Sequence, residues 1–499
     1  RDTDRSRGLG DVYKRQLYIL PLVWMLVFTS CNSDFLDREP SNKYTDDILL
    51  TSTEGGMMLL NGTLRRTYIS YESHAQYGQK AVDIMTDMLG EDYYTGDGYW
   101  NNYESWYSWL AHRSANDEDN KFVWMYYYGT IDNMNFLLAN VDAMVGEQKE
   151  RDNLKGQAYA FRAHSYFKLV QLYAERYKPE GRNTQLGIPV YTHPTSEGKA
   201  RSTVEEVYTR INTDLDSAMM LLTEGRIHIS HFNLNVAQGI KAEVLLTMGK
   251  YKEAAKMAHE ARQGFGLMPQ ELFAAGFNSV NNPEWMWGMQ IKVDQSTIYA
   301  SYFSNTDPCS IGYNELGNEK RINSQLYDAM NDSDVRKSVC VGADGATLEC
   351  DNGEFEVPPY TVNKFRLPSY ANWSGDYCYM RAAEMYLIEA EGLARSDQSR
   401  EAAKVLYELV SARDPKYKLP DVTGNALVEE VMLQRRLELL GEGFRFMDMK
   451  RLNLSLDRTD KGHEETFLKP AKVDAGDIRW QFLIPTQEMT SNPNMVQND

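Results

Sequence analysis

Along the chain, long stretches in which apolar residues recur every three or four positions alternate with stretches that have no such period. The first helical period begins near Glu54. Longer periodic blocks follow in two groups, at 121–145, 152–175 and 203–223 and then at 379–395, 399–412 and 425–440. Ser202 or Thr203, each with a Glu three residues later, forms a capping box at the start of the third block. The pattern predicts a mainly helical protein.

Residues 241–256 and 389–404 form an internal repeat. Aligned without gaps, seven of the sixteen positions are identical, among them the consecutive residues Glu-Ala-Ala-Lys near the end of each copy. Each copy reads as a helix, a short polar turn and a second helix, with small residues where the two helices cross. Small residues let helices pack closely, as in tetratricopeptide helix pairs. Because the copies are far apart in the sequence, we expect stacked helix pairs within one domain, interrupted by a large insertion.

The segment between the two copies, about 265–378, is rich in Gly, Pro, Asn and aromatic residues. Two stretches in it, 284–293 and 360–367, have the composition of short strands. We therefore predict a mostly α fold in which tetratricopeptide-like helix pairs form a scaffold and a loop-rich insertion carries a few short strands. The predicted scaffold covers about 46–264 and 379–450, in a single domain over 46–499.

The N-terminal region has the pattern of a lipoprotein leader. Two basic residues precede an uncharged run, LYILPLVWMLVFTSC, that ends at Cys31. The run is shorter than the roughly 20 residues that a membrane-spanning helix needs. We expect removal of residues 17–30 as a signal peptide, lipid on Cys31, and a polar tether over 31–45. Simple cleavage that leaves a free Cys31 is the alternative. Residues 1–16 have no apolar pattern, and we expect them to be a scar of cloning or sequence assembly.

The charge balance narrows the possible partners. The chain has 53 basic and 71 acidic residues, a formal net charge of −18. Such an excess repels phosphate backbones, which argues against nucleic-acid binding, and it also disfavours electrostatic docking on anionic lipid. A lipid on Cys31 would then be the anchor to the membrane.

Metal, cofactor and disulfide signals are weak. The eight His residues lack metal-ligand spacing, so we expect no metal site and no cofactor. Asp332 and Asp334 are weak Ca²⁺ candidates and are more typical of turn caps. Cys340 and Cys350 flank a Gly- and Asp-rich turn, which allows a hairpin disulfide, and unpaired thiols are an equal alternative.

The candidate binding chemistry lies in an aromatic loop at 91–109. Its sequence, EDYYTGDGYWNNYESWYSW, holds eight Tyr and Trp residues among Gly, Asn and Asp. Sugar rings pack their C–H faces on aromatic rings, and their hydroxyls bond to polar side chains. A local mini-core under the loop is the alternative. We predict ligand contact for at least one of Tyr99 and Trp100, with Tyr94 and Asn101 beside them. The secondary candidates, all in the insertion, are Tyr299, Tyr302, Tyr313 and Trp373.

Six motifs occur along the chain in a fixed order. They are CNSDFLDREPSNKYTD, VWMYYYGTIDNMNFLLANVD, QAYAFRAHSYFKLVQLY, RAAEMYLIEAEGLA, RRLELLGEGFRFMDMKRL and FLIPTQEMTSNPNMVQN. Together they resemble the SusD/RagB family of outer-membrane lipoproteins from Bacteroidetes. Most motif residues suit structural roles. In particular, the alternation of charged and apolar residues over 435–451 indicates helices that pair through buried ions.

The resemblance implies a non-catalytic, surface-exposed lipoprotein of the outer membrane. Such a protein would capture oligosaccharide or polysaccharide and pass it to a SusC-like TonB-dependent transporter. No single binding residue follows from the resemblance, because the loops share no motif. Peptide or glycopeptide cargo within the same family is an alternative, as is a helical-repeat adaptor that binds only protein. A secreted glycoside hydrolase would need two carboxylates about 5–9.5 Å apart, and no motif singles out such a pair.

Overall fold

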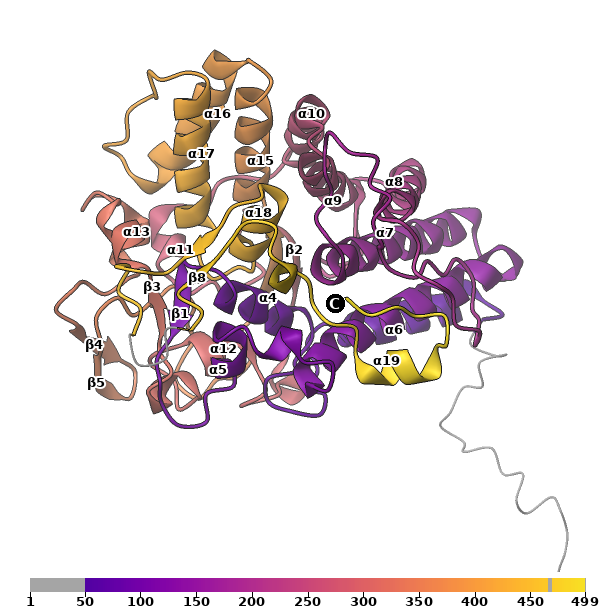
Figure 1. Ribbon diagram of the computed structural model, residues 1–499, viewed down its shortest axis with the longest axis horizontal. Helices are drawn as coiled ribbons and strands as arrows, with labels where there is room; N and C mark the ends of the chain where they lie inside the picture. Colours follow the sequence, from indigo (N-terminus) through magenta and orange to yellow (C-terminus); the bar gives the residue numbers. More distant parts are fainter. Residues whose placement is uncertain (1–49, 465–468, 499) are drawn as a thin grey trace, which may run out of the picture. The chain divides into compact units, whose positions relative to one another are not determined.

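The computed structural model describes residues 50–464 and 469–498. The predicted signal peptide, Cys31, the tether and residues 1–16 lie outside the described residues. Within them, helices dominate and strands are short, so the mostly α fold class is confirmed (Figure 1). None of the helices that are described is both long and apolar enough to cross a membrane.

The scaffold is a series of long helices that pack on one another in sequence order. Its members are α3 (Thr53–Arg65), α6 (Glu118–Asn140), α7 (Gln148–Tyr173), α8 (Val204–Leu221), α9 (Leu234–Thr247), α10 (Tyr251–Ala261), α15 (Ala382–Ala394), α16 (Ser399–Arg413) and α17 (Asn425–Glu438). Helix α7 packs on α6 and α8, α9 on α8 and α10, and α15 on α10, α16 and α17. In Figure 1 the helices α7 to α10 and α15 to α17 follow one another as adjacent layers. The predicted helix pairs are therefore present.

The two repeat copies are neighbours in space, because α10 of the first copy packs on α15 of the second. A Cβ atom at Gly392 would lie 2.4 Å from the carbonyl oxygen of Tyr251 and 2.9 Å from the Cβ of Ala255. Any larger residue at position 392 would push the helices apart. The repeat thus marks the point where the chain rejoins its scaffold after the insertion.

Helix α8 confirms the predicted capping box. The backbone N–H of Glu206 donates to the Thr203 hydroxyl at 3.2 Å, and the Glu206 carboxylate accepts from the backbone N–H of Thr203 at 2.8 Å. Helix α4 (Gln79–Met88) was not predicted, although its apolar residues recur at helical spacing. Its polar face is buried as well, since all of its residues except Asp83 are buried.

The remaining elements are short. The helices are α5 (Glu104–Tyr107), α11 (Gln270–Phe273), α12 (Tyr302–Thr306), α13 (Ser324–Asp328), α14 (Val335–Ser338), α18 (Arg445–Arg451) and α19 (Thr486–Ser491). The strands are β1 (Tyr93–Thr95), β2 (Trp285–Met289), β3 (Lys320–Ile322), β4 (Ala346–Cys350), β5 (Gly353–Val357), β6 (Tyr377–Arg381), β7 (Leu456–Asp457) and β8 (Lys472–Val473). In Figure 1 most short elements of the insertion gather beside α4 and α5, away from α7 to α10.

The described strands form four antiparallel pairs, β1 with β3, β2 with β6, β4 with β5, and β7 with β8. The predicted strand at 284–293 is confirmed as β2. The predicted strand at 360–367 is wrong, because only Thr361 and Val362 form isolated bridges there. The predicted helix at 379–395 begins later, at Ala382, since the residues before it form β6.

Buried charges join the insertion to the scaffold in a cluster that we call the ionic seam: Glu284, Arg381, Arg413, Glu438 and Glu442. The Arg381 guanidinium contacts Glu284, Glu438 and Glu442 at 2.6–2.8 Å, and Arg413 contacts Glu284 at 2.6 Å and Glu438 at 3.1 Å. The two arginines hold the pKa of Glu438 well below its usual range. The prediction of buried ion pairs over 435–451 is thereby confirmed.

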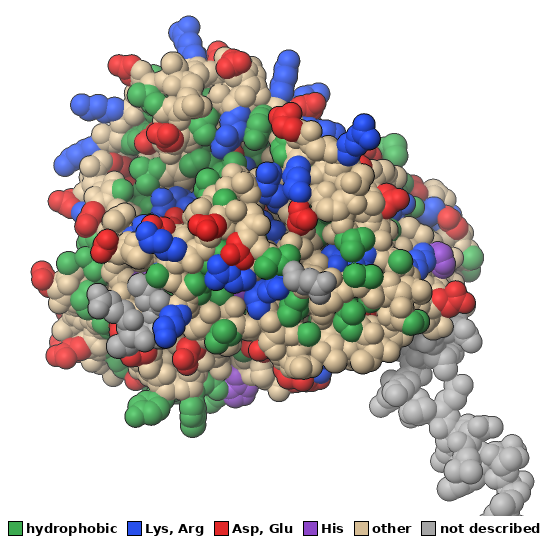
Figure 2. Space-filling model, viewed as in Figure 1, with side chains coloured by type: hydrophobic (Ala, Val, Ile, Leu, Met, Phe, Trp, Pro, Cys, Tyr) green, Lys and Arg blue, Asp and Glu red, His purple; other side chains and the backbone are tan. Residues whose placement is uncertain are grey.

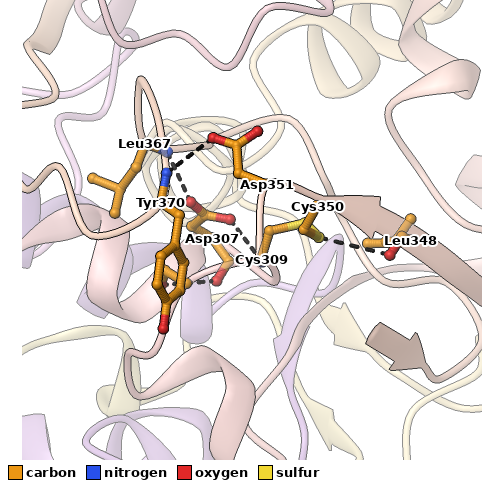
Figure 3. Close-up of a disulfide and its surroundings, with 8 residues drawn as sticks. Asp307, Cys309, Leu348, Cys350, Asp351, Leu367 and Tyr370 are labelled. Carbon is orange, nitrogen blue, oxygen red and sulfur yellow. Dashed lines mark hydrogen bonds between the residues drawn. A yellow bond between two sulfur atoms is a disulfide. The ribbon is translucent and has the colours of Figure 1, made fainter. Parts of the chain in front are cut away.

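A disulfide joins Cys309 to Cys350 (Figure 3). Neither alternative for Cys340 and Cys350 holds in full, because Cys350 pairs with Cys309 and Cys340 is free. Strand β4 runs from Ala346 to Cys350, and five extended residues span about 17 Å, which carries Cys350 away from Cys340. Cys340 and Cys378 are free thiols. The carboxylate of Asp351, next to the bridge, accepts from the backbone N–H of Tyr370 at 3.1 Å. The bridge therefore fixes the hairpin β4–β5 beside the loop that leads to Trp373.

Candidate functional site

The aromatic loop at 91–109 divides into buried and exposed rings. Six of its rings are at most 3% exposed: Tyr93, Tyr94, Tyr103, Trp106, Tyr107 and Trp109. The other two rings, which are consecutive in the chain, are exposed: Tyr99 is 85% exposed and Trp100 is 77% exposed. The loop therefore contains a mini-core and also presents two rings to solvent.

Tyr94 and Tyr302, both predicted as ligand contacts, are core residues. Tyr94 lies on β1, stacks on His463 with ring centroids 4.4 Å apart, and donates its hydroxyl to the carbonyl of Gly462 at 2.7 Å. Tyr302 opens α12, is 2% exposed, and donates to the carbonyl of Gly441 at 2.8 Å. Neither ring offers a face on which a ligand could stack, so these two predictions are corrected.

Close backbone contacts hold the exposed pair in place. A Cβ atom at Gly98 would lie 2.1 Å from the carbonyl oxygen of Leu316, so only glycine permits this approach. Trp100 adopts a left-handed backbone with φ of 56°, which is uncommon for a bulky residue and needs support from its surroundings. Asn101 supplies part of it: its amide donates to the carbonyl of Gly96 at 2.7 Å, and its side-chain oxygen accepts from the N–H of Tyr103. Asn101 thus shapes the loop.

Three of the rings predicted in the insertion come together around a histidine. Tyr299 is 43% exposed, and its ring centroid lies 6.4 Å from that of Tyr313 and 5.7 Å from that of Trp373. His74 and the hydroxyl of Tyr313 share a hydrogen bond of 2.6 Å, and the His74 ring also neighbours Tyr299 at 6.3 Å. Tyr313 and Trp373 are half-buried. A lone His gave no sequence signal for this position.

One amide connects the two groups of rings. The side-chain nitrogen of Asn318 donates to the carbonyl oxygen of Tyr99 at 2.8 Å and to that of Tyr313 at 3.0 Å. The carbonyl oxygens of Tyr99 and Tyr313 therefore lie at most about 6 Å apart. We call the combined surface of His74, Tyr99, Trp100, Tyr299, Tyr313 and Trp373 the aromatic face. Figure 2 shows hydrophobic side chains that project from the lower edge of the molecule beside a histidine.

Beneath the aromatic face lies a buried cation. Lys320, on β3, is 1% exposed, and its ammonium donates to the carbonyl of Asn318 at 2.7 Å and to the Thr95 hydroxyl at 3.3 Å. Burial lowers the pKa of Lys320 to about 7. Partial burial also raises the pKa of Glu315, which lies between Tyr313 and Asn318 in the chain. Lys320 and Asn318 together brace the turn that carries both ring groups.

Neither the metal candidates nor a cavity beside α3 belongs to this surface. Asp334 caps α14 and pairs with Arg336, and Asp332 pairs with Lys337 at 2.7 Å. No cluster of three or more potential metal ligands occurs in the described part of the chain. A cavity of about 670 Å³ lies between α3, the start of α7 and residues 223–227, and none of its lining residues belongs to the aromatic face.

This arrangement suits ligand binding. Exposed rings on a braced loop can stack on flat, weakly polar ligand faces at low entropic cost, because little side-chain freedom remains to be lost. The aromatic face consists of rings and a histidine, and the amides of Asn101 and Asn318 beside it donate to backbone carbonyls of the protein.

Comparisons with known proteins agree with the sequence motifs. Residues 34–246 match a family model described as "Starch-binding associating with outer membrane", and residues 268–499 match the model of the SusD family. SusD-like protein P2 of Formosa agariphila is 24% identical over 433 residues, which cover 77% of this chain and 81% of that protein. These sequence matches together span nearly the whole described scaffold and insertion.

Solved structures show the same fold. A SusD-like carbohydrate binding protein from Bacteroides vulgatus superimposes with a TM-score of 0.78 at 26% identity, over 89% of this chain and 97% of that one. A SusD superfamily protein from Bacteroides thetaiotaomicron gives a TM-score of 0.75 at 23% identity, over 90% of this chain and 100% of that one. With two family models along its length and this fold, the chain belongs to the SusD/RagB family.

Proposed function

We propose that this protein is a lipoprotein of the outer-membrane surface that captures oligosaccharides on its aromatic face. One observation carries the proposal: Tyr99 and Trp100 present their rings to solvent from a loop that glycine contacts and Asn318 hold in place. Large rings exposed side by side on a braced loop are typical of a binding surface. Pyranose rings match such a surface because one side is apolar C–H and the rim is hydroxyl.

Membership of the family supports the carbohydrate and the membrane location. One matching family model is described as starch-binding and associating with the outer membrane, and the similar Bacteroides vulgatus structure bears the name of a carbohydrate binding protein. The lipoprotein leader ending at Cys31 supports attachment through lipid. Delivery of the captured glycan to a SusC-like TonB-dependent transporter follows from the family resemblance, and the stacked helices offer a broad protein-binding surface for it.

The test is retention of the purified full chain by polysaccharides in native affinity electrophoresis. Trp100→Ala should weaken retention at least tenfold, because loss of one stacking ring removes about 1.4 kcal/mol or more of binding free energy. The matched control is Tyr407→Ala, which removes a ring that is 39% exposed on α16. Equal retention of the two variants would contradict the proposal.

The same incubation separates capture from hydrolysis. Binding without release of new reducing ends supports capture, and their appearance would support a glycoside hydrolase. Co-purification of the transporter from outer membranes, lost when Cys31 is replaced by Ser, would support delivery at the membrane. Retention of peptides in place of any glycan would favour the alternative cargo.

A further inference from the structure

The segments that carry the aromatic face contain no Lys or Arg. These segments are residues 67–79, 91–112, 293–319 and 367–380. They do contain acidic residues, and Asp97, Glu104 and Glu315 among them are exposed. Each segment extends to the next basic residue in the chain, for example from Arg66 to Lys80 and from Lys292 to Lys320, so the nearest cations in sequence are the flanking ones.

Several cations that flank these segments have partners elsewhere. Lys292, directly before residue 293, is exposed, and among the described contacts it lies over no ring of the aromatic face. Lys80 is 3% exposed and pairs with Asp83 at 3.1 Å, and Lys320 is buried on Asn318. Arg321 pairs with Glu464 and with Glu319. Arg113 donates to the carbonyl of Gln481 at 2.7 Å. In the part of the chain that the structure describes, the Lys and Arg groups that lie over aromatic rings lie over rings such as Tyr302 and Tyr103, and none lies over Tyr99, Trp100, Tyr299, Tyr313 or Trp373.

An anionic sugar would therefore lose hydration on this surface without gaining a cationic partner. Proteins that bind carboxylate or sulfate groups use Arg or Lys because charge-assisted hydrogen bonds replace the lost water. The exposed Asp97 lies three residues before Trp100 in the same loop, so it adds negative charge near the exposed ring pair and disfavours an anionic ligand at moderate salt. An uncharged sugar faces neither cost.

We infer that the aromatic face selects uncharged oligosaccharides and rejects glycans that carry carboxylate or sulfate groups on the stacked sugars. The inference rests on the proposed function, since it names the substrate class of the same site. It separates neutral storage and structural glycans from uronic-acid and sulfated ones as cargo.

The experiment compares matched ligands on one backbone. Starch, glucomannan and laminarin are each tested for retention of the full chain, beside the same polymer oxidised at C6 to carry carboxylates. The oxidised form of any retained polymer should bind at least tenfold more weakly at 0.15 M salt. Equal or tighter binding of the oxidised form, with loss in Trp100→Ala, would overturn the inference and leave the proposed function intact. Absence of retention by every glycan in a wider array would overturn both.

Reversal of one charge tests whether the aromatic face itself causes the preference for uncharged polymer. Asp97→Lys should reduce the difference in retention between the neutral and the oxidised polymer, most strongly at low salt. Glu429→Lys makes the same charge change at an exposed position on α17 and should leave this difference unchanged. Identical behaviour of the two variants would show that net charge, not the aromatic face, sets the preference, and would overturn the inference.

Discussion

The ionic seam buries charged side chains and the aromatic face exposes aromatic ones, which is the reverse of the usual distribution. The seam encloses five charged residues that are nearly inaccessible to solvent, whereas the aromatic face exposes Tyr99 and Trp100 to it. The seam is neutralised by pairing within the protein, so it acts on folding and holds the insertion on the scaffold. The aromatic face has exposed ring surface, which the proposed sugar ligand would cover. Burial and pairing, rather than residue type, separate the structural cluster from the proposed binding surface.

The largest effect should come from breaking the seam. Arg381→Met leaves three buried carboxylates without their central cation, and loss of one member of a buried ion cluster costs about 3–5 kcal/mol of unfolding free energy. Urea unfolding followed by circular dichroism measures the loss. Arg400→Met is the control, because Arg400 is exposed on α16. Similar unfolding midpoints for the two variants would mean that the seam does not stabilise the fold.

Two tryptophans of the same loop provide a sharper contrast. Trp106 is fully buried with its ring 5.6 Å from that of Phe482, so Trp106→Ala should cost about 3–5 kcal/mol. Trp100→Ala should change stability by no more than about 0.5 kcal/mol and should still lose glycan retention. Thermal unfolding and affinity electrophoresis of both variants test this. A large stability loss for Trp100→Ala would place that ring in the mini-core.

The seam should also show a characteristic pH dependence. Arg381 and Lys364 lower the pKa of Glu442 from 4.5 to about 2, against the opposing effect of burial. A lowered folded-state pKa stabilises the protein above the unfolded pKa, and this stabilisation is lost as the pH falls from about 5 toward 2. The stability difference between the parent and Glu442→Gln should therefore be about 3 kcal/mol near neutral pH and shrink over that window. A pH-independent difference would contradict the assignment, and the Trp100→Ala difference should stay flat throughout.

The smallest effect concerns the link between the two ring groups. Asn318→Ala removes two hydrogen bonds to backbone carbonyls, so we expect about 1–2 kcal/mol of lost stability and weaker retention of glycan. Asn494→Ala removes a single exposed amide bond, to the carbonyl of Gly198, and should change neither property. Unchanged retention in Asn318→Ala would show that the two ring groups bind independently.

The sequence predicted the scaffold well because amphipathic helices record their burial in a local period. The capping box at Thr203 and the repeat that joins α10 to α15 are both readable from neighbouring residues. Two features were missed. Helix α4 shows apolar residues at helical spacing, but it has only 10 residues and its polar face is buried as well. The bridge of Cys350 to Cys309 depends on where the hairpin β4–β5 turns.

The candidate site was only partly predictable because ring exposure depends on distant partners. Tyr94 and Tyr99 look alike in the sequence, but β1 pairs with β3, more than 200 residues away, and this pairing buries Tyr94. Arg413 likewise reads as the end of a helix, although its guanidinium reaches Glu284 in the insertion. Non-local pairing of this kind leaves no mark on either segment alone.

The bond geometry at Asn318 separates the spacing of the rings from their identity. Its amide donates to the main-chain oxygens of positions 99 and 313, and every amino acid supplies such an oxygen. Replacement of Tyr99 by Phe, Trp or a polar residue should therefore keep the distance between positions 99 and 313. It would change only the side chain that is presented to a ligand. A single side chain thus sets the spacing of two backbone positions without fixing which side chains they carry.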